Sequence, residues 1–360
     1  MNVLLLCRTE IFALNVLRCL ADSKVKSCVF GHGKMWSVSL SKHCREYVQC
    51  YFTDFRNPGA GLIEKINTYC ETRKIDFVIP TDYETAYLLA KIKRHLKRCT
   101  KPFPVSEPDV LEMLDDKWEF AKLLAANDLP FPKTFLVETF EQLEKIDLPF
   151  PRIVKPFRVR RVWSGGIGAS YLKKNQAEYL ASGRDKGSCP LLVQEFIPGI
   201  DIDLSILAHE GKIVSWTIQK WIKNDTLQFM SSKEILDLGR KVVAAVNYDG
   251  VAHFDLRIDE RDGSVKFLEC NPRFWGTLRA SMWNGVNFVG DGLMVGQGKI
   301  SMRQNVSKDI TYVLPATILS KLLRGKLSEI RNIPDASKQD LKQIISDPLS
   351  CLCSVMRQIL

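Results

Sequence analysis

The chain has 360 residues, of which 46% are hydrophobic and 26% charged, and its formal net charge is +10. This length allows two or three domains, and the composition is ordinary for a globular protein. No apolar run approaches the ~18 residues that a membrane span needs, so we expect no membrane partner.

The excess of lysine and arginine favours anionic ligands. The basic residues are dispersed and no DNA- or RNA-binding signature appears, so we expect no nucleic-acid partner. Eleven cysteines lie scattered from Cys7 to Cys353 without a C-x-x-C pair, which favours reduced thiols in the cytoplasm over zinc sites or disulfides. The opening segment, MNVLLLCRTE, has too short an apolar core for a signal peptide and is interpreted as a buried first strand.

Short apolar runs alternate with helix-like segments over roughly the first 110 residues. Strands are expected at residues 3–7, 27–31 and 76–82, and helices at 13–20, 64–75 and 84–96. Strands separated by helices predict parallel β-α-β units in a doubly wound sheet. The first turn, CRTEIFALN, lacks the G-x-G-x-x-G fingerprint, which argues against a dinucleotide site there.

The middle of the chain mixes helices with hairpins. One helix is expected at 116–127, ended by Pro130 and Pro132, and another at 233–247. A hairpin over 201–221 should turn at Glu210-Gly211. Further strands are expected at 152–155, 169–172 and 191–199. Beyond residue 300 the spacing of apolar residues predicts a mostly helical tail.

Residues 251–277 form the most informative segment. They predict a strand that ends at Asp255, a turn at Asp262-Gly263 and a return strand. Because strand side chains repeat every two residues, the return strand places three polar side chains on one face, Glu269, Asn271 and Arg273. The carboxylates of Asp255 and Glu269 and the amide oxygen of Asn271 suit Mg²⁺ rather than zinc. The guanidinium of Arg273 can bind a phosphate or carboxylate with two hydrogen bonds. The segment therefore predicts a site for a metal–phosphate complex.

Five short motifs follow one another in a meaningful order. They are Asp-Lys at 116–117, Val-Lys-Pro at 154–156, a glycine loop at 163–170, Gln-Glu-Phe-Ile-Pro-Gly at 194–199 and Glu-Cys-Asn-Pro-Arg at 269–273. This order resembles the ATP-grasp superfamily of carboxylate–amine or carboxylate–thiol ligases, which includes D-alanine–D-alanine ligase, biotin carboxylase and carbamoyl phosphate synthetase. The ending N-P-R-F-W-G is similar to that of the ATP-grasp carboligases.

The resemblance covers about five-sixths of the chain and implies an α/β (α+β) ATP-grasp fold. A pre-ATP-grasp domain with a Rossmann-like, doubly wound parallel sheet would occupy residues 1–113. A two-lobed nucleotide-clamping domain would occupy residues 114–300, with a lid at about 150–196. A helical extension would follow at 301–360.

The resemblance also implies which residues hold ATP. Lys117 would contact the α-phosphate, and Lys155 would bridge the α- and β-phosphates. A lysine on an apolar strand is rarely buried without an anion, which favours this role for Lys155. Backbone N–H groups of the glycine loop would close over the phosphates, from Gly165, Gly166 and Gly168.

Adenine would lie along the inter-lobe strand formed by Gln194, Glu195, Phe196 and Ile197. An acidic residue shortly after this strand would bind the ribose hydroxyls. Asp201 fits that position best, and Asp203 is the alternative.

The metal and the reacting groups would lie on the acidic hairpin. Asp255, Glu269 and Asn271 would bind one or two Mg²⁺ ions, which Mn²⁺ can replace, and Glu269 would bridge them. Arg273 would stabilise charge on the acylphosphate and on its tetrahedral successor. His253 is interpreted as structural, since a lone histidine more often is. The acceptor pocket would be lined by Trp275, Ser281 and Trp283.

The resulting hypothesis is an ATP- and Mg²⁺-dependent ligase acting on small molecules, a carboxylate and an amine. The carboxylate would be activated as an acylphosphate, and the amine would displace phosphate to form an amide. Two alternatives stay open: a phosphotransferase acting on an alcohol or a carbamate, and a nucleotide-binding regulatory module with little turnover. Whether the protein forms a homodimer stays open under each of these hypotheses. The identities of the substrates stay open, as do the roles of the 301–360 tail and of Arg158, Arg160 and Arg161.

Overall fold

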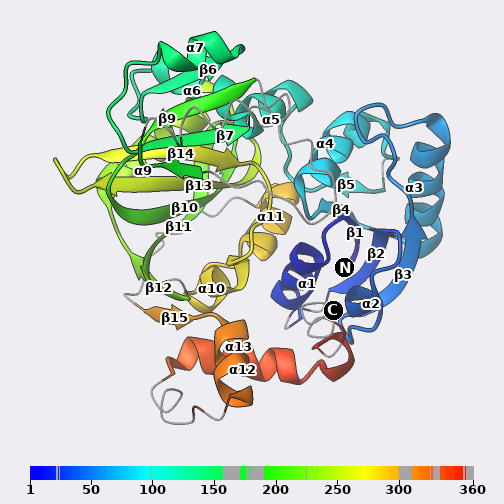
Figure 1. The fold of residues 1–360 in the computed structure, drawn as a ribbon. Coiled ribbons are helices and arrows are strands. Elements are labelled where there is room, and N and C mark those ends of the chain that lie inside the picture. Colours follow the sequence, from blue (N-terminus) through cyan, green and yellow to red (C-terminus); the bar gives the residue numbers. More distant parts are fainter. Residues whose placement is uncertain are drawn as a thin grey trace. The chain divides into compact units, whose positions relative to one another are not determined.

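A computed structural model describes residues 1–21, 23, 25–97, 99–156, 171–175, 178, 190–223, 225–299, 310–324, 326, 333–351 and 353. The chain divides into two compact units, each assembled from separate segments of sequence. Unit 1 contains Met1–Leu111, Asp203–His253 and Asn271–Leu360, and unit 2 contains Glu112–Ile202 and Phe254–Cys270. The chain contains both helices and strands throughout, which confirms the predicted α/β class (Figure 1).

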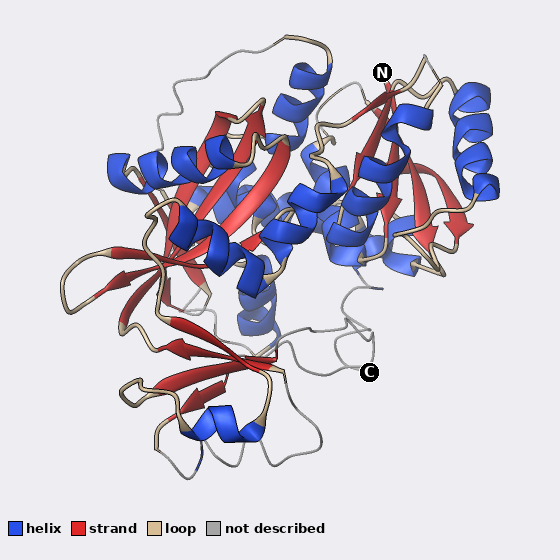
Figure 2. Ribbon diagram, turned by 90° about the horizontal axis from the view of Figure 1, so that it is seen from above, coloured by secondary structure: helices blue, strands red, loops and turns tan. Residues whose placement is uncertain are grey.

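The first sheet of unit 1 is parallel, with strand order β3-β2-β1-β4-β5. Its strands are β1 (Asn2–Cys7), β2 (Lys26–His32), β3 (Cys44–Cys50), β4 (Phe77–Pro80) and β5 (Lys101–Pro102). Helices flank them (Figure 2), namely α1 (Glu10–Cys19), α2 (Trp36–Ser39), α3 (Ala60–Arg73), α4 (Tyr83–Ile92), the 3₁₀ turn η1 (Lys93–His95) and α5 (Pro108–Asp115), whose last turn enters unit 2. The doubly wound parallel sheet was predicted correctly, because strands covered on both faces are continuously apolar.

A second, six-stranded sheet has the order β14-β13-β10-β11-β12-β15. Its strands are β10 (Gly199–His209), β11 (Lys212–Lys223), β12 (Thr226–Met230), β13 (Gly250–Asp259), β14 (Val265–Asn271) and β15 (Thr311–Val313). Three helices accompany it in sequence, α9 (Lys233–Ala245), α10 (Leu278–Trp283) and α11 (Phe288–Gly296). The chain passes from one unit to the other within β10, β13 and β14.

Both predicted hairpins are present. The turn between β10 and β11 lies at Glu210-Gly211, where both residues have positive φ angles of 48° and 70°, as a type I′ turn requires. The turn between β13 and β14 contains Gly263, with φ of 76°. The prediction that the first strand ends at Asp255 was wrong, because β13 continues to Asp259 and places Asp255 inside the strand.

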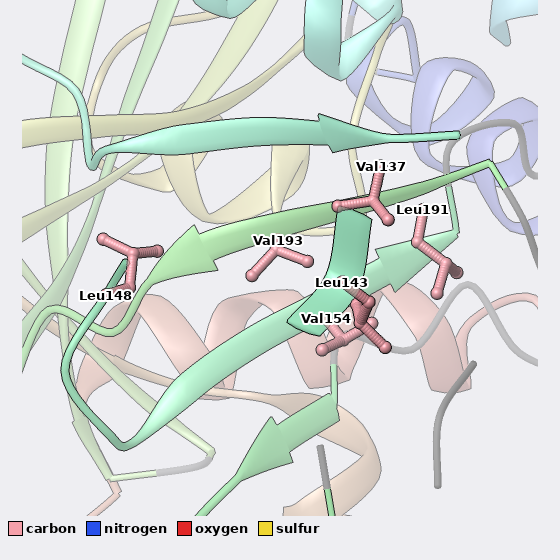
Figure 3. Close-up of a cluster of buried hydrophobic side chains, with 6 residues drawn as sticks. All are labelled: Val137, Leu143, Leu148, Val154, Leu191 and Val193. Carbon is pink, nitrogen blue, oxygen red and sulfur yellow. The ribbon is translucent and has the colours of Figure 1, made fainter. Parts of the chain in front are cut away.

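A third sheet, β6-β9-β7-β8, belongs to unit 2 and has antiparallel pairs. It contains β6 (Thr134–Val137), β7 (Arg152–Pro156), β8 (Tyr171–Lys173) and β9 (Leu191–Glu195), with helices α6 (Lys117–Ala126) and α7 (Phe140–Glu144). Figure 3 shows the apolar cluster gathered between these strands and α7, formed by Val137, Leu143, Leu148, Val154, Leu191 and Val193. This core holds β7, which carries Lys155, against β9.

The tail contributes both helix and strand to unit 1. Besides α12 (Pro315–Leu323) and α13 (Asp335–Ile345), it supplies β15, which pairs with β12. Asp340 of α13 is fully buried and binds three side chains, those of Arg279, Trp283 and Tyr312. No helix in the described part of the chain is long and apolar enough to cross a membrane. The division into domains at residues 113 and 300 stays a prediction.

Gly199, which opens β10, can be tested by substitution. Its φ is +135°, and a Cβ atom there would collide with the carbonyl oxygen of Ile258. We expect Gly199→Ala to destabilise unit 2 by at least about 1–3 kcal/mol, the usual cost of a strained backbone, and to lower the melting temperature. Gly61→Ala is the control, since nothing lies within 4 Å of the position and its helix favours alanine. Equal melting temperatures for the two variants would contradict this account.

Candidate active site

Two lysines and two carboxylates gather in unit 2. Asp116 caps helix α6, since its side chain accepts the N–H groups of Trp118 at 2.9 Å and Glu119 at 3.1 Å. This cap fixes the start of the helix, so that Lys117 is its first residue. The Lys117 ammonium forms an ion pair with the Glu269 carboxylate, and each side chain is about a quarter exposed.

Lys155 projects from β7 and is 6% exposed. Its pKa is lowered to about 8, mainly by burial and also by the neighbouring charge of Lys117, whereas the charges of Glu269 and Asp255 act in the opposite direction. A cation held in this way is poorly compensated. It fits a position that an anionic ligand completes.

Glu269 of β14 and Asp255 of β13 supply the acidic side of this cluster. Burial by itself raises the pKa of Glu269, but the charge of Lys117, a hydrogen bond with Asp255 and the charge of Lys155 together hold it below its usual range. Two carboxyl groups within hydrogen-bonding reach of each other offer only oxygen atoms. Such a donor set fits Mg²⁺ or Mn²⁺, which prefer oxygen ligands.

Asn271 and Arg273 lie in unit 1 and are held together. The Arg273 guanidinium donates to Asn271 Oδ1 at 2.8 Å and to the Phe274 carbonyl at 2.9 Å. It also lies 4.7 Å from the ring centroid of Phe12 in the first turn of α1. The following loop is tied to the same helix, because Asn15 Nδ2 donates to the Gly276 carbonyl at 3.0 Å.

The predicted adenine strand is β9 and the residues after it, in unit 2. Gln194 is buried and donates to Thr134 Oγ1 at 2.9 Å, and Ile197 is 3% exposed. The Glu195 carboxylate accepts from Arg261 at 2.8 Å, so this segment is attached to the turn of the β13–β14 hairpin. Phe196 lies 5.6 Å from the guanidinium of Arg257. The adenine role of these residues stays a prediction.

Asp201 and Asp203 have different surroundings. Asp201 is exposed and pairs with Arg257 at 2.9 Å. Asp203 is buried in unit 1, where it accepts from Gln219 Nε2 at 2.9 Å and from Trp221 Nε1 at 3.0 Å. Asp203 therefore already has two donors inside the fold. A ribose role stays a prediction for both residues.

A buried polar layer beside Asp203 was missed by the sequence analysis. Three alternate residues of β11 bond side chains from the α10–α11 region, through the pairs Ser215–Asp291, Thr217–Ser281 and Gln219–Thr277. Polar residues at period two in an otherwise apolar strand were the available signal. His253 of β13 belongs to this layer, since Nδ1 lies 2.9 Å from Ser205 Oγ and the ring stacks on Trp275 at 5.2 Å.

The glycine loop lies outside the described residues. This applies to Gly165, Gly166 and Gly168, and to the neighbouring Arg158, Arg160 and Arg161. Their predicted contact with the phosphates stays a prediction.

The burial of Lys155 predicts a gain in stability when its charge is removed. Because its pKa is lower in the folded than in the unfolded state, the cost is fully present below pH 8 and fades as pH rises toward 10.5. We expect Lys155→Met to stabilise the protein at pH 7 by up to roughly 3 kcal/mol, at about 1.4 kcal/mol per pKa unit. Urea unfolding at pH 7 and pH 10 measures this, and the exposed Lys145→Met is the control. A Lys155→Met variant less stable than wild type at pH 7 would refute the assignment.

Comparison with known proteins agrees with this arrangement. Residues 188–314 match the family described as ATP-grasp in the biosynthetic pathway with Ter operon. The chain is 25% identical to a D-aspartate ligase of Enterococcus faecium over 228 residues, which are 55% of this chain and 54% of that protein. It therefore spans about half the length of that relative.

Solved structures share the fold over most of the chain. An L-amino acid ligase from Bacillus licheniformis superposes with a TM-score of 0.62 at 16% identity, covering 86% of this chain and 78% of that one. An N5-carboxyaminoimidazole synthetase from Staphylococcus aureus superposes with a TM-score of 0.65 at 11% identity, covering 92% and 86%. The fold is thus the ATP-grasp fold that the motifs predicted, and the family match over residues 188–314 supports the predicted resemblance to the ATP-grasp superfamily.

Proposed function

We propose that this protein is an ATP- and Mg²⁺-dependent ligase that joins a small-molecule carboxylate to an amine. The observation that carries the proposal is the cluster of Lys117, Lys155, Asp255 and Glu269 in unit 2. Two cations beside two carboxylates can hold a triphosphate and its metal at the same time. The D-aspartate ligase and the L-amino acid ligase that the chain resembles are ligases by name, which supports this reaction class.

The lysines would bind the nucleotide. Lys155, buried on β7, would lie against phosphate oxygens, whose negative charge offsets the cost of burying the ammonium. Lys117 would release Glu269 as phosphate enters, because the ammonium can pair with either anion. Asp255 and Glu269 of unit 2 would hold Mg²⁺, which would neutralise phosphate charge during phosphoryl transfer. The part of Asn271, which belongs to unit 1, stays a prediction.

The reaction would take place in two steps. A carboxylate oxygen of the first substrate attacks the γ-phosphorus of ATP, and the bond to ADP breaks, which gives an acylphosphate. The amine of the second substrate then attacks the acyl carbon, a C–N bond forms, phosphate leaves and a proton is released from the nitrogen. Arg273 would donate hydrogen bonds to the oxygen on which negative charge develops, a contribution of roughly 3–4 kcal/mol at comparable sites.

Glu269→Gln tests the proposal. The substitution keeps the shape of the side chain but removes the charge that pairs with Lys117 and that would hold the metal. We expect ADP release to fall by at least about 10²-fold, as the loss of a charge-stabilising group implies. The assay supplies Mg-ATP with pools of carboxylates and amines, and it follows ADP, phosphate and, with hydroxylamine, hydroxamate.

The exposed Glu260→Gln, on the β13–β14 turn, is the matched control and should keep full activity. ADP formation that survives in Glu269→Gln would overturn the proposed metal site. Nucleotide binding without turnover in the wild type, with every substrate pool, would favour the regulatory module.

A further inference from the structure

Asp203 places a buried carboxylate in unit 1, and the proposed phosphoryl and acyl transfers do not use it. The residue lies on β10 and is 6% exposed. A charge in such a position is costly unless another charge or a set of hydrogen bonds compensates it. No lysine or arginine in the described part of the chain pairs with Asp203. Its compensation therefore has to come from neutral donors or from a ligand.

The two oxygens of this carboxylate have different surroundings. Oδ2 accepts from Gln219 Nε2 at 2.9 Å and from Trp221 Nε1 at 3.0 Å. His253 Nε2 lies 3.8 Å from the same oxygen, which is beyond hydrogen-bonding distance. Oδ1 forms no hydrogen bond with any of the described residues. Since Oδ1 is also not fully enclosed, it is the oxygen that a ligand can reach.

The Gln219 amide holds the carboxylate in place and has unused bonding capacity of its own. The residue is fully buried, and its Nε2 also donates to Thr277 Oγ1 at 2.9 Å. One amide thus links the carboxylate on β10 to the hydroxyl that precedes α10. The amide oxygen Oε1 is enclosed and has no hydrogen-bond partner. Buried acceptors are normally bonded, so an unpartnered one indicates that a donor is missing here.

Two neighbours of Asp203 are partly exposed. Trp221 bonds the carboxylate directly, and Thr277 is joined to it through Gln219. Ser205, the next inward-facing residue of β10, is fully buried instead. The approach to Asp203 therefore runs beside an indole ring and a hydroxyl group. Both suit a positively charged ligand, because an aromatic face attracts cations and a hydroxyl oxygen can accept a hydrogen bond.

Charge and the number of acceptors decide the kind of ligand. One carboxylate supplies one negative charge, so a univalent cation neutralises it, whereas a divalent ion would leave positive charge buried. The hard metal ions of protein sites bind six or more oxygen atoms. The described side chains offer Asp203 Oδ1, Gln219 Oε1 and Thr277 Oγ1. A primary ammonium group has three N–H donors, so this small set of acceptors fits it better than a metal ion.

We propose that Asp203 binds an ammonium group of the carboxylate substrate, with Gln219 and Thr277 completing the site. A neighbouring carboxylate favours the protonated form of an amine, and a protonated nitrogen has no lone pair with which to attack an acyl carbon. The group held by Asp203 is therefore an amino group that does not react. An amino acid that reacts through its carboxylate meets this condition. The identity of the ligand as a substrate rests on the proposed ligase function, whereas the binding of ammonium does not.

The first test uses methylammonium as the probe on the full-length protein without nucleotide. Melting curves are compared in methylammonium, sodium, potassium and choline chloride at equal ionic strength. Methylammonium should raise the melting temperature by at least about 2 °C over choline, whose quaternary nitrogen has no N–H group, because a ligand of the folded state stabilises it. Sodium and potassium should behave as choline does. An equal rise with sodium or potassium would overturn the assignment to an ammonium group.

Variants locate the site. Asp203→Asn keeps an oxygen that can accept from Gln219 and Trp221 but removes the charge, so it should abolish the methylammonium shift. Thr277→Val should reduce the shift by removing one acceptor. Glu234→Gln, an exposed carboxylate of α9 in the same unit, is the matched control and should keep the full shift. Circular dichroism spectra establish that each variant is folded. The proposal is overturned if the wild type shows no shift, or if Asp203→Asn and Thr277→Val both keep it.

Substrate pairs separate this proposal from the proposed ligase function. Glycine, alanine and aspartate are each compared with the corresponding hydroxy acid, namely glycolate, lactate and malate, with hydroxylamine as the acceptor. At least one amino acid should exceed its hydroxy acid by ~10-fold or more in kcat/KM, and Asp203→Asn should remove that preference. Turnover without such a preference would contradict the ammonium site alone. A protein that shows the methylammonium shift but never forms ADP would contradict the ligase function alone, and Glu269→Gln should lose turnover but keep the shift.

Discussion

The buried ammonium of Lys155 is the constraint on which the proposed site depends. A charged lysine inside a protein is costly, and a second lysine next to it raises that cost. Two carboxylates reduce the cost without removing it. The chain therefore maintains a region of unit 2 that is less stable alone than it would be with an anion bound, which is typical of functional sites.

Regular secondary-structure elements position the two lysines and the two carboxylates of this cluster. The β13–β14 hairpin presents both carboxylates, β7 presents one lysine and the first turn of α6 presents the other. Each element is held by local features, namely the Asp116 cap, the apolar cluster under α7 and the bonds from Arg261 to Glu195 and Asp259. Rigid supports of this kind keep charged side chains in place before a ligand arrives.

Unit 1 uses the same principle at the end of its parallel sheet. The Asp82 carboxylate accepts hydrogen bonds from the backbone N–H groups of Arg8 and Thr9, which fixes the turn after β1. Arg273 and Asn15 connect the loop after β14 to α1, so that loop and helix form one block within the unit. The buried Asp340 fixes the tail in a similar way, because its bonds to side chains of α10 and β15 join α13 to both elements.

The sequence by itself determined the features that repeat over a few neighbouring residues. The apolar strands of the first sheet, the Asp-Lys helix start, the Glu210-Gly211 turn and the shared face of Glu269 and Asn271 all follow from local periodicity and turn chemistry. The half-exposed strand β3 was missed because CREYVQC lacks an apolar run, and β15 was missed because three residues are too few for a pattern. Only the tertiary structure decided that Lys117 meets Glu269, 152 residues away, that Asp203 is buried whereas Asp201 is not, and that Arg8 and Arg56 both lie beside the ring of Phe55. These contacts depend on how segments that are distant in the sequence pack together, and local sequence patterns contain no information about that packing.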